Sequence, residues 1–508
     1  MNKRTFVKNT AVMTVTSLLL RTLGIVFRVF ISNRVGAEGM GLYQLVFSVY
    51  VLGTTFAAAG LTTAVTRLVA EHLARGDGQA VRRVMRYSLW LCVGIGALSA
   101  LLLYAGAPVI GGWIGDTRTV PALQVSGIAL PFIGISSCIK GYFAARRRAG
   151  PPCLSQIIEQ TVRIGGILWM LHAAGDGCSL EDACRIIILG DALSETVACG
   201  YLTVAYGADR GRGSPRASHP PSAVMRPLLG IALPLTAGRY LATLLRTVEN
   251  ILVPARLAMY THSTALALTQ FGAIKGMALP LIFFPSAFLM TVSGLLIPEL
   301  SDANALGHRR QVAYLVERAV QVTALGGILI GCFFTVLGRQ LGDYLYGDDA
   351  VGLYLQILGP LTPVMYLDSV ASGMLKGLGE QVQSLWYSIA DSAVRVALIL
   401  LLLPLYGITG FLFVMLVSNL LTSLLSTHRL LTVSGCGMQW RRWVFSPLLI
   451  AVLAGGGWTA LERLWSPTGL WSLLGGGAFI LTVYGLLLPL FGCVTGEDIQ
   501  VFLRRKTT

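Results

Sequence analysis

The sequence predicts an all-α polytopic membrane protein, and three observations support this prediction. The hydrophobic share is 54% and the charged share only 12%, which is about half the charged share of a typical soluble protein. Apolar runs recur at the length of a membrane-spanning helix, and the basic residues collect between these runs. The net charge of +15 therefore favours an anionic membrane surface and argues against a nucleic-acid partner.

About fourteen apolar stretches reach the roughly 20 residues that cross a bilayer core. In the first half of the chain they cover residues 10–33, 42–68, 87–108, 121–143, 154–173 and 185–206. In the second half they cover residues 225–254, 263–297, 313–338, 352–375, 383–404, 408–428, 443–462 and 469–493. The stretches 42–68 and 263–297 are long, so we expect them to tilt, kink or protrude. Gly276, Pro280 and Pro285 are expected to break the second one.

Basic residues alternate between the two sides of the membrane along this series. One side receives clusters such as Arg82, Arg83 and Arg86, whereas the other receives only Arg34, Arg118, Arg185, Arg256, Arg339 and Arg463. Because Lys and Arg favour the cytoplasmic side, both termini are expected in the cytoplasm of a bacterial cell, with the chain in its cytoplasmic membrane. Arg21 and Arg28 interrupt the first apolar run, so no cleavable signal peptide is expected there.

A polar connection at residues 207–224 separates two similar halves of the chain. It predicts a cytoplasmic linker between a six-helix lobe at residues 1–206 and a second six-helix lobe at 225–430. Residues 431–508 then add a helix pair and a cytoplasmic tail.

Internal similarity supports two copies of one unit. Glu159 precedes Arg163 by four residues in the fifth stretch, and Asp391 precedes Arg395 in the same way in the eleventh. The copies are preceded by the pairs Lys140-Gly141 and Lys376-Gly377, and the first and seventh stretches both carry arginines seven residues apart. An even number of helices per copy predicts a parallel repeat, as in several transporter folds.

Positive charges inside the first, seventh and eighth stretches predict the main binding site. A charge at mid-membrane costs about 2.5 kcal/mol or more, yet these stretches contain Arg21, Arg28, Arg239, Arg246 and Lys275. Glu249 is the acid on the same three helices, which leaves a formal surplus of four positive charges. Such a surplus favours a water-filled cavity with an anionic ligand, and the planar guanidinium suits phosphate oxygens.

The other charged groups predict ion pairs or coupling groups. The spacing of Glu159 and Arg163, and of Asp391 and Arg395, favours local helix salt bridges. Asp191 and Glu195 lie four residues apart and repel each other, so they face water, pair with a base such as Arg163, or carry a proton. Asp368 stays undecided among the same options.

No catalytic or metal-binding pattern stands out in the sequence. It has no Walker loop, His-Glu-x-x-His motif or nucleophile elbow, so we expect neither an enzyme nor a cofactor or metal. Cys178 and Cys184 flank a loop on the outer side, and whether they form a disulfide or remain separate thiols is left open.

Several segments resemble a known family. These are Thr16-Ser-Leu-Leu-Leu-Arg21-Thr-Leu-Gly-Ile25, Val35-Gly-Ala-Glu-Gly-Met-Gly-Leu-Tyr-Gln44 and Ser155-Gln-Ile-Ile-Glu-Gln-Thr-Val-Arg163. The chain is similar over its whole length to the stage V sporulation protein B-like polysaccharide transporters. They belong to the multidrug/oligosaccharidyl-lipid/polysaccharide exporter superfamily and are related to the lipid II flippases.

The resemblance implies a flippase for an undecaprenyl-pyrophosphate-linked saccharide, with lipid II for spore cortex peptidoglycan as the expected cargo. It implies alternating access by two lobes, membrane lipids as surroundings, and a monomer. The related flippases have essential basic residues in helices one, two and eight, which Arg21, Arg28 and Lys275 match in part. Thr54 and Thr55 occupy the region of the helix-two arginine, and Val29 replaces an acid. These departures suggest that Arg239 and Arg246 take over that charge.

Two alternatives share the architecture. One is an exporter of a different lipid-linked polysaccharide unit. The other is a cation-coupled multidrug antiporter, which would need acids such as Asp191, Glu195 and Asp368 in its cavity.

Overall fold

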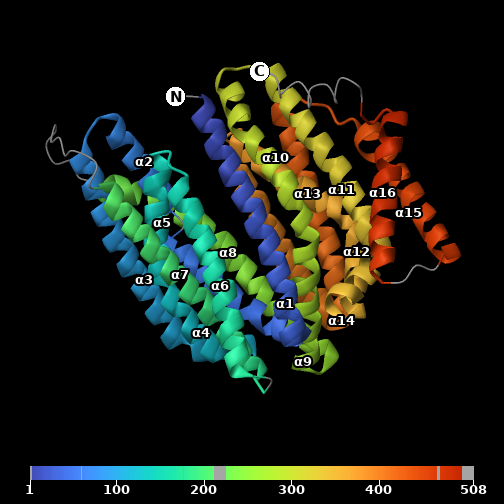
Figure 1. Cartoon of the computed structure of the whole chain (residues 1–508), viewed down its shortest axis with the longest axis horizontal. Helices are drawn as coiled ribbons and strands as arrows, with labels where there is room; N and C mark the ends of the chain where they lie inside the picture. The colour runs from blue at the N-terminus through green and yellow to red at the C-terminus, as the bar shows by residue number, and fades with distance from the viewer. Residues whose placement is uncertain (1–2, 59, 176, 211–224, 466–468, 495–508) are drawn as a thin grey trace. The chain divides into compact units, whose positions relative to one another are not determined.

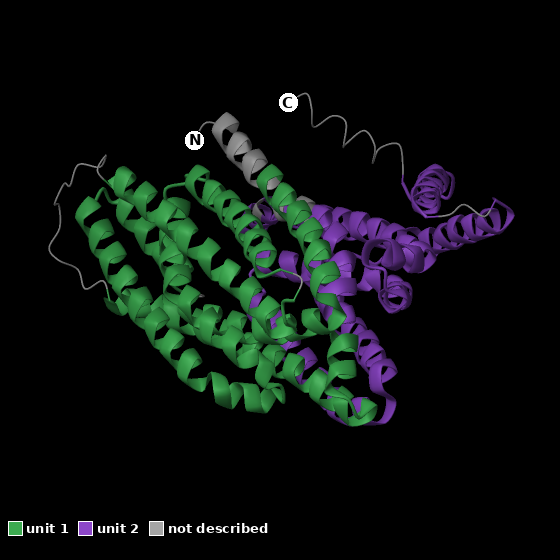
Figure 2. Cartoon of the chain, turned by 60° about the horizontal axis from the view of Figure 1, so that its bottom comes forward, with its two compact units in different colours: residues 1–272 green, residues 273–508 purple. Residues whose placement is uncertain are grey.

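A computed structural model describes residues 3–58, 60–175, 177–210, 225–465 and 469–494. Within these ranges the chain consists of helices and short connections, without a strand (Figure 1). This confirms the predicted all-α class. The chain divides into two compact units, residues 1–272 and 273–508 (Figure 2).

The first unit contains nine α-helices among its described residues. They are α1 (Lys3–Ala58), α2 (Leu61–Ala74), α3 (Gly78–Ile114), α4 (Val120–Ser126), α5 (Leu130–Ala145), α6 (Gly150–Ala174), α7 (Leu180–Arg210), α8 (Met225–Thr261) and α9 (Thr264–Phe271). The second unit is built from α10 (Leu279–Ala305), α11 (Arg309–Tyr346), α12 (Asp349–Leu358), α13 (Thr362–Gly377), α14 (Gln381–Ser434), α15 (Ser446–Trp465) and α16 (Leu470–Leu490).

Eleven of the described helical segments are long and apolar enough to cross a membrane. Two of them, Val15–Ala74 and Gln381–Ser434, each contain two of the stretches predicted from sequence. Helix α6 contains a further predicted stretch but is not one of these eleven segments, because its polar residues lower its mean hydropathy. The protein is therefore an integral membrane protein, while the number of crossings stays a prediction.

Glycines turn the chain inside the two longest helices. Gly36 in α1 has φ 71° and ψ 179°, and Gly407 in α14 has φ 55° and ψ −133°. A positive φ strains residues with a Cβ atom, whereas glycine adopts it readily. Each of these helices is therefore two helices joined at a sharp bend.

The long stretch at 263–297 is broken where Gly276 and Pro280 predict it. A π-helical segment runs from Gly272 to Ala278, and α10 begins at Leu279 with Pro280 in its first turn. The break expected at Pro285 is wrong, because α10 continues through it. A proline removes only one backbone hydrogen bond, and surrounding helices can tolerate that loss in a membrane protein.

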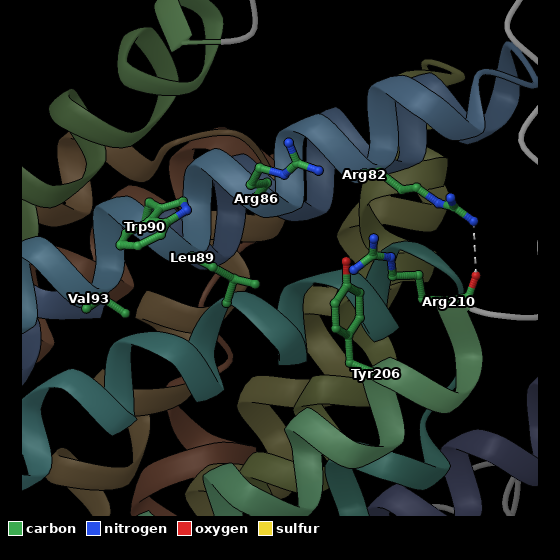
Figure 3. A pocket seen from close by; sticks show the side chains of 7 residues that line it. All are labelled: Arg82, Arg86, Leu89, Trp90, Val93, Tyr206 and Arg210. Carbon is green, nitrogen blue, oxygen red and sulfur yellow. Dashed lines mark hydrogen bonds between the residues drawn. The ribbon is translucent and has the colours of Figure 1, made fainter.

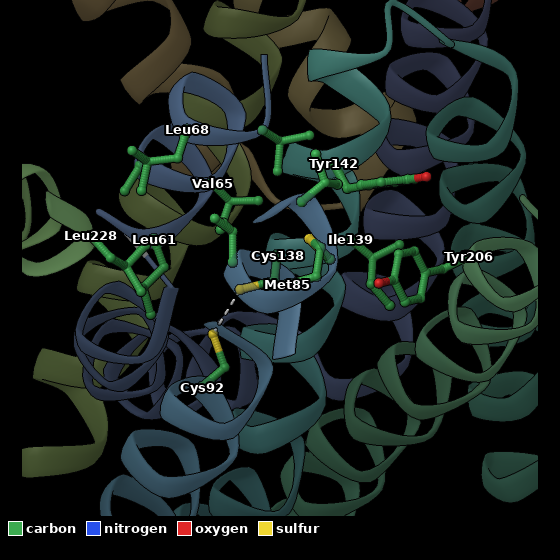
Figure 4. Packing of buried hydrophobic residues seen from close by; sticks show 14 of the residues in the cluster. Leu61, Val65, Leu68, Met85, Cys92, Cys138, Ile139, Tyr142, Tyr206 and Leu228 are labelled. Carbon is green, nitrogen blue, oxygen red and sulfur yellow. Dashed lines mark hydrogen bonds between the residues drawn. The ribbon is translucent and has the colours of Figure 1, made fainter. Parts of the chain in front are cut away.

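The core of the first unit joins α2, α3, α5, α7 and α8. It includes Val65, Met85, Ile139 and Leu228 (Figure 4). The Sγ atoms of Cys92 and Cys138 lie 3.0 Å apart inside it, and both side chains are fully buried. Helices far apart in the sequence are thereby held as one body by apolar contact.

The core of the second unit lies mainly between α10, α11, α13 and α14. The C-terminal pair α15 and α16 packs on α11 through two further apolar clusters. Gly476 of α16 lies against this seam. A Cβ atom on it would lie 2.7 Å from the Trp458 ring and 2.8 Å from Leu337 Cδ2.

The predicted lobes and the two compact units divide the chain differently. The lobes 1–206 and 225–430 follow the sequence repeat, whereas α8 and α9 make their contacts within the first unit. The proposed six-helix lobes therefore remain a prediction. Residues 207–210 of the predicted linker end α7, and residues 211–224 lie outside the described part, as does the predicted tail from residue 495.

We expect Gly476→Ala to lower the stability of the protein. The added methyl group overpacks the seam against Trp458 and Leu337, and overpacking typically costs about 1–3 kcal/mol. Thermal unfolding of the detergent-purified protein measures this as a lower midpoint.

Gly485→Ala is the matched control, since Gly485 lies on the same helix and its added Cβ meets no atom within 4 Å. This control should leave the midpoint unchanged or raise it slightly. Equal losses in both variants would contradict close packing at Gly476.

Candidate functional site

A buried ion network lies inside the first unit, centred on Arg163 of α6. Its Nη2 atom lies 2.8 Å from Glu159 Oε1, and its Nε atom lies 2.7 Å from Asp191 Oδ1 on α7. Its Nη1 atom also donates a hydrogen bond of 3.2 Å to Gln160 Oε1. The guanidinium therefore joins α6 to α7 and places two carboxylates beside one positive charge.

The network neutralises most of its own charge. Lys140 of α5 lies 4.0 Å from Glu159 Oε2, and Asp191 is only 6% exposed. Glu195, one turn after Asp191, interacts electrostatically with Lys140 and Arg163. Of the options left open for Asp191, the structure therefore shows pairing with Arg163.

Of the two predicted arginines on α1, Arg21 and Arg28, it is Arg28 that interacts with this network. Its charge acts on Asp191 and on Tyr43. One turn earlier, a Cβ on Gly24 would lie 3.9 Å from Gln160 Nε2 of α6. Asp191 on α7 thus contributes to the charge balance around Arg28. The expected surplus of four counted only three helices and omitted these acids.

The remaining predicted arginines of the first unit are not covered by other parts of the protein. The side chains of Arg21 on α1 and of Arg239 and Arg246 on α8 are all exposed. Among the described residues, Arg21 and Arg246 form no ion pair. Their charges are therefore available to a ligand that approaches these faces.

Polar contacts run along the packing of α8 against the second half of α1. Thr247 Oγ1 donates to the Ser48 carbonyl oxygen at 3.1 Å, and Asn250 Nδ2 donates to Ser48 Oγ at 2.8 Å. The hydroxyl oxygens of Thr55 and Thr243 lie 3.4 Å apart. Later residues of α1 thus meet earlier residues of α8, so the two segments are antiparallel.

This packing is relevant to the departure from the flippase pattern. Thr55 stands in the region where the family resemblance implies an arginine, and its partner Thr243 lies on α8 between Arg239 and Arg246. The α8 arginines come four residues before and three residues after this contact. They are therefore on the helix that packs directly against the Thr54–Thr55 region.

Backbones approach closely where α1 meets α9. A Cβ on Gly41 would lie 2.3 Å from the carbonyl oxygen of Leu268, and one on Gly272 would lie 1.9 Å from that of Ala37. Neither position has room for a side chain, so this contact requires glycine on both sides.

The predicted site residues of the second unit fall into separate places. Lys275 lies in the π-helical segment, with Nζ 5.9 Å from the centre of the Phe411 ring. Asp391 and Arg395 form the expected pair at 2.8 Å. Ser418, beyond the bend in α14, donates to Asp391 and accepts from Arg395.

Two further acids named in the sequence analysis are Asp368 and Glu249. Asp368 Oδ1 accepts a hydrogen bond of 3.0 Å from Ser426 Oγ, so α13 is linked to α14. Glu249 is 2% exposed within the first unit.

Sequence reasoning missed three members of the network in the first unit. Lys140 was interpreted only as part of a repeated Lys-Gly pair, yet it reaches Glu159. Tyr43 and Tyr50 are buried beside Asp191 and Arg163. Their spacing of seven residues on one face of α1 was the available signal.

No group of three or more metal-ligating side chains occurs in the part of the chain that the structure describes. Cys178 and Cys184 are free thiols. Burial raises the pKa of the Cys178 thiol, and the charge of Asp182 adds to this effect. Cys178 is therefore a less reactive thiol than an exposed cysteine.

The ion pairs and arginines described above lie among helices that are long and apolar enough to cross a membrane. The protein is therefore a polytopic integral membrane protein. More specifically, the chain belongs to the polysaccharide biosynthesis protein family, whose sequence profile matches residues 6–303. It is 26% identical to stage V sporulation protein B of Bacillus subtilis (strain 168), over 98% of each chain. It is also 28% identical to lipid II flippase MurJ of the same organism, over 31% of this chain and 30% of the relative.

Solved structures show the same fold. Lipid II flippase MurJ in an inward closed conformation has a TM-score of 0.70 at 13% identity, covering 96% of this chain and 98% of the other. An inward-facing multidrug resistance MATE family transporter of the MOP superfamily has a TM-score of 0.68 at 15% identity, covering 83% and 99%. At these identities the likeness establishes the fold.

We expect Arg163→Gln to destabilise the protein markedly. Removing the guanidinium leaves Asp191 buried without its ion-pair partner, which typically costs about 3–5 kcal/mol. The midpoint of thermal unfolding in detergent measures this loss.

Arg75→Gln provides the comparison, because Arg75 forms an exposed pair with Glu71, with side chains 59% and 43% exposed. Losing such a pair changes stability by less than about 1 kcal/mol. If the two variants unfold at the same temperature, the network around Arg163 is not a structural anchor.

Proposed function

We propose that the protein moves an undecaprenyl-pyrophosphate-linked saccharide from the cytoplasmic to the outer leaflet of the bacterial cytoplasmic membrane. The expected cargo is lipid II for peptidoglycan and spore cortex synthesis. The observation that carries the proposal is the pair of arginine faces, Arg21 and Arg28 on α1 and Arg239 and Arg246 on α8. The similarity to stage V sporulation protein B over nearly the whole chain supports it.

A pyrophosphate head group suits these faces chemically. Arginine donates two parallel hydrogen bonds to neighbouring phosphate oxygens and keeps its charge in any protein environment. In the proposed cycle the head group enters a cavity open to the cytoplasm and binds Arg21, Arg28, Arg239, Arg246 and Lys275. The prenyl chain stays in lipid throughout.

In this proposal the ion network around Arg163 helps to position the arginines of α1. It joins α6 to α7, and the negative charge of Asp191 in this network attracts the Arg28 guanidinium, for which an anionic head group would compete. Glu195, Asp368 and the Asp391–Arg395 pair are the remaining candidates for groups that couple transport to an ion gradient.

The proposed direction agrees with the electrical gradient. An inside-negative potential assists an outward-moving anion by about 2.3 kcal/mol per charge for each 100 mV. A two-charge head group therefore gains free energy without nucleotide hydrolysis. Two lobes that expose the same site alternately to each side would complete the cycle, and no chemical step on the substrate is proposed.

Binding of lipid II to the detergent-purified protein tests the proposal. We expect native mass spectrometry to show lipid II bound to the wild type and lost in Arg21→Ala/Arg28→Ala. Removing two phosphate contacts should weaken binding at least tenfold, since each charge-assisted hydrogen bond contributes about 1.5–3 kcal/mol.

Arg34→Ala is the control variant, because Arg34 lies on the same helix beyond the predicted span and its side chain is exposed. It should bind lipid II like the wild type. Retention of lipid II by the double variant would sink the cationic-site model. Stronger binding of another prenyl-pyrophosphate saccharide would instead favour an exporter of that polysaccharide unit.

The competing function is a cation-coupled multidrug antiporter. The likeness to the MATE fold and the acids Asp191, Glu195 and Asp368 motivate it. However, Asp191 is paired with Arg163, and a neutralised acid attracts organic cations weakly. We therefore expect that expression in a drug-sensitive strain will not raise resistance to cationic dyes. Resistance that disappears in Asp191→Asn would favour the antiporter.

A further inference from the structure

A groove on the first unit lies away from every site residue discussed so far. It has a volume of about 250 Å³ and lies between the beginning of α3 and the end of α7 (Figure 3). Three arginines line it: Arg82 and Arg86 of α3 and Arg210 of α7. None of the described residues that line the groove is acidic.

The α3 side of the groove changes from charged to apolar along one helix face. Arg82 and Arg86 are followed on that face by Leu89, Trp90 and Val93. At a rise of 1.5 Å per residue, Arg82 and Val93 are about 16 Å apart along the helix. Trp90 is 71% exposed, and an exposed tryptophan below a row of arginines is typical of the membrane–water interface.

The apolar face continues deeper along the same helix. Leu101 and Tyr104, about two and three turns beyond Val93, are 64% and 59% exposed. In an integral membrane protein such side chains face the hydrocarbon of the lipid. The groove therefore opens at one end to water and at the other to acyl chains.

The α7 side supplies the third charge, Arg210. Arg82 Nη2 donates to the carbonyl oxygen of Arg210 at 3.5 Å, which joins the two helix ends. Tyr206, one turn before Arg210, is 9% exposed and packs edge-on against Tyr142 with ring centres 4.9 Å apart. The base of the groove is thus held rigidly by packed side chains.

The acid in the adjoining pocket is already engaged. Asp209 is 5% exposed, and both its carboxylate oxygens are held by Arg146 and Arg148. Tyr142 Oη also donates to Asp209 Oδ2 at 2.9 Å. Arg86 and Arg210 therefore present their charge to the groove, whereas Arg82 is bonded to the end of α7.

We propose that this groove binds the phosphate head group of an anionic phospholipid, with its acyl chains along Trp90 and Val93. Guanidinium groups match phosphate oxygens, and basic residues at a membrane surface attract anionic lipids. A free phosphate ion would leave the exposed apolar half unexplained. The site is separate from the arginines of the proposed transport path, so it does not depend on the proposed function.

Native mass spectrometry of the full-length protein in detergent tests the site, with phosphatidylglycerol and phosphatidylcholine of identical acyl chains as probes. We expect phosphatidylglycerol to bind more tightly, and increasingly so at low salt. Arg86→Gln should weaken its binding about fivefold, since a basic residue at a membrane surface contributes about 1 kcal/mol. Trp90→Ala should weaken both lipids.

Two control variants on α3 match these changes. Arg83→Gln removes the same charge from a neighbouring residue that does not line the groove. Trp113→Ala removes an equally exposed tryptophan, 75% exposed, at the other end of the helix. Both should bind phosphatidylglycerol within twofold of the wild type, and thermal unfolding verifies that all four variants are folded.

Four results would overturn the proposal. Equal binding of the two lipids, or equal loss in Arg86→Gln and Arg83→Gln, would show that the groove does not recognise the head group. Displacement of phosphatidylglycerol by inorganic phosphate at matched concentration would identify a soluble-anion site. Tighter binding of undecaprenyl pyrophosphate, lost in Arg86→Gln, would identify an entry point for a transported lipid instead.

Discussion

The pairing of Arg163 with Asp191 and Glu159 is the interaction on which the first unit depends. Three ionised groups are expensive to remove from water, and their cost is offset only if each has a close partner of opposite sign. Arg163 meets this condition for both acids at once. The resulting geometry fixes α6 against α7. It also fixes the position of Asp191, the acid on which the charge of Arg28 acts.

The second unit also offsets the cost of burying an ion pair, but it uses a hydroxyl group for this purpose. Asp391 and Arg395 form the same four-residue pair, but the contact to the following helix is made by the Ser418 hydroxyl. A hydroxyl that both donates and accepts completes the pair without adding charge. The two ion pairs therefore share the same spacing and differ in the contact to the next helix, which is a carboxylate at Arg163 and a hydroxyl at Arg395.

Sequence reasoning predicted most of the fold because membrane burial leaves a strong pattern. The apolar stretches, the local pairs at Glu159 and Asp391, and the break near Gly276 all follow from spacing along one helix. Contacts between helices were mostly not predicted, and the Asp191–Arg163 pair was only one of several options. Lys140 lies 19 residues before Glu159 in the sequence, and Asp191 lies on another helix from Arg28. Periodicity orders residues on one helix but does not say which face meets which neighbour.

The paired glycines Gly41 and Gly272 have a mechanical consequence. Where two backbones touch, no side chain can change rotamer to absorb a small displacement, so the contact is either made or lost. The second half of α1 and the segment that follows α8 should then move together as a rigid lever. Bending is left to Gly36, whose left-handed φ of 71° already interrupts the helix. We therefore expect motion of α1 to occur at Gly36 and to leave the glycine contact intact.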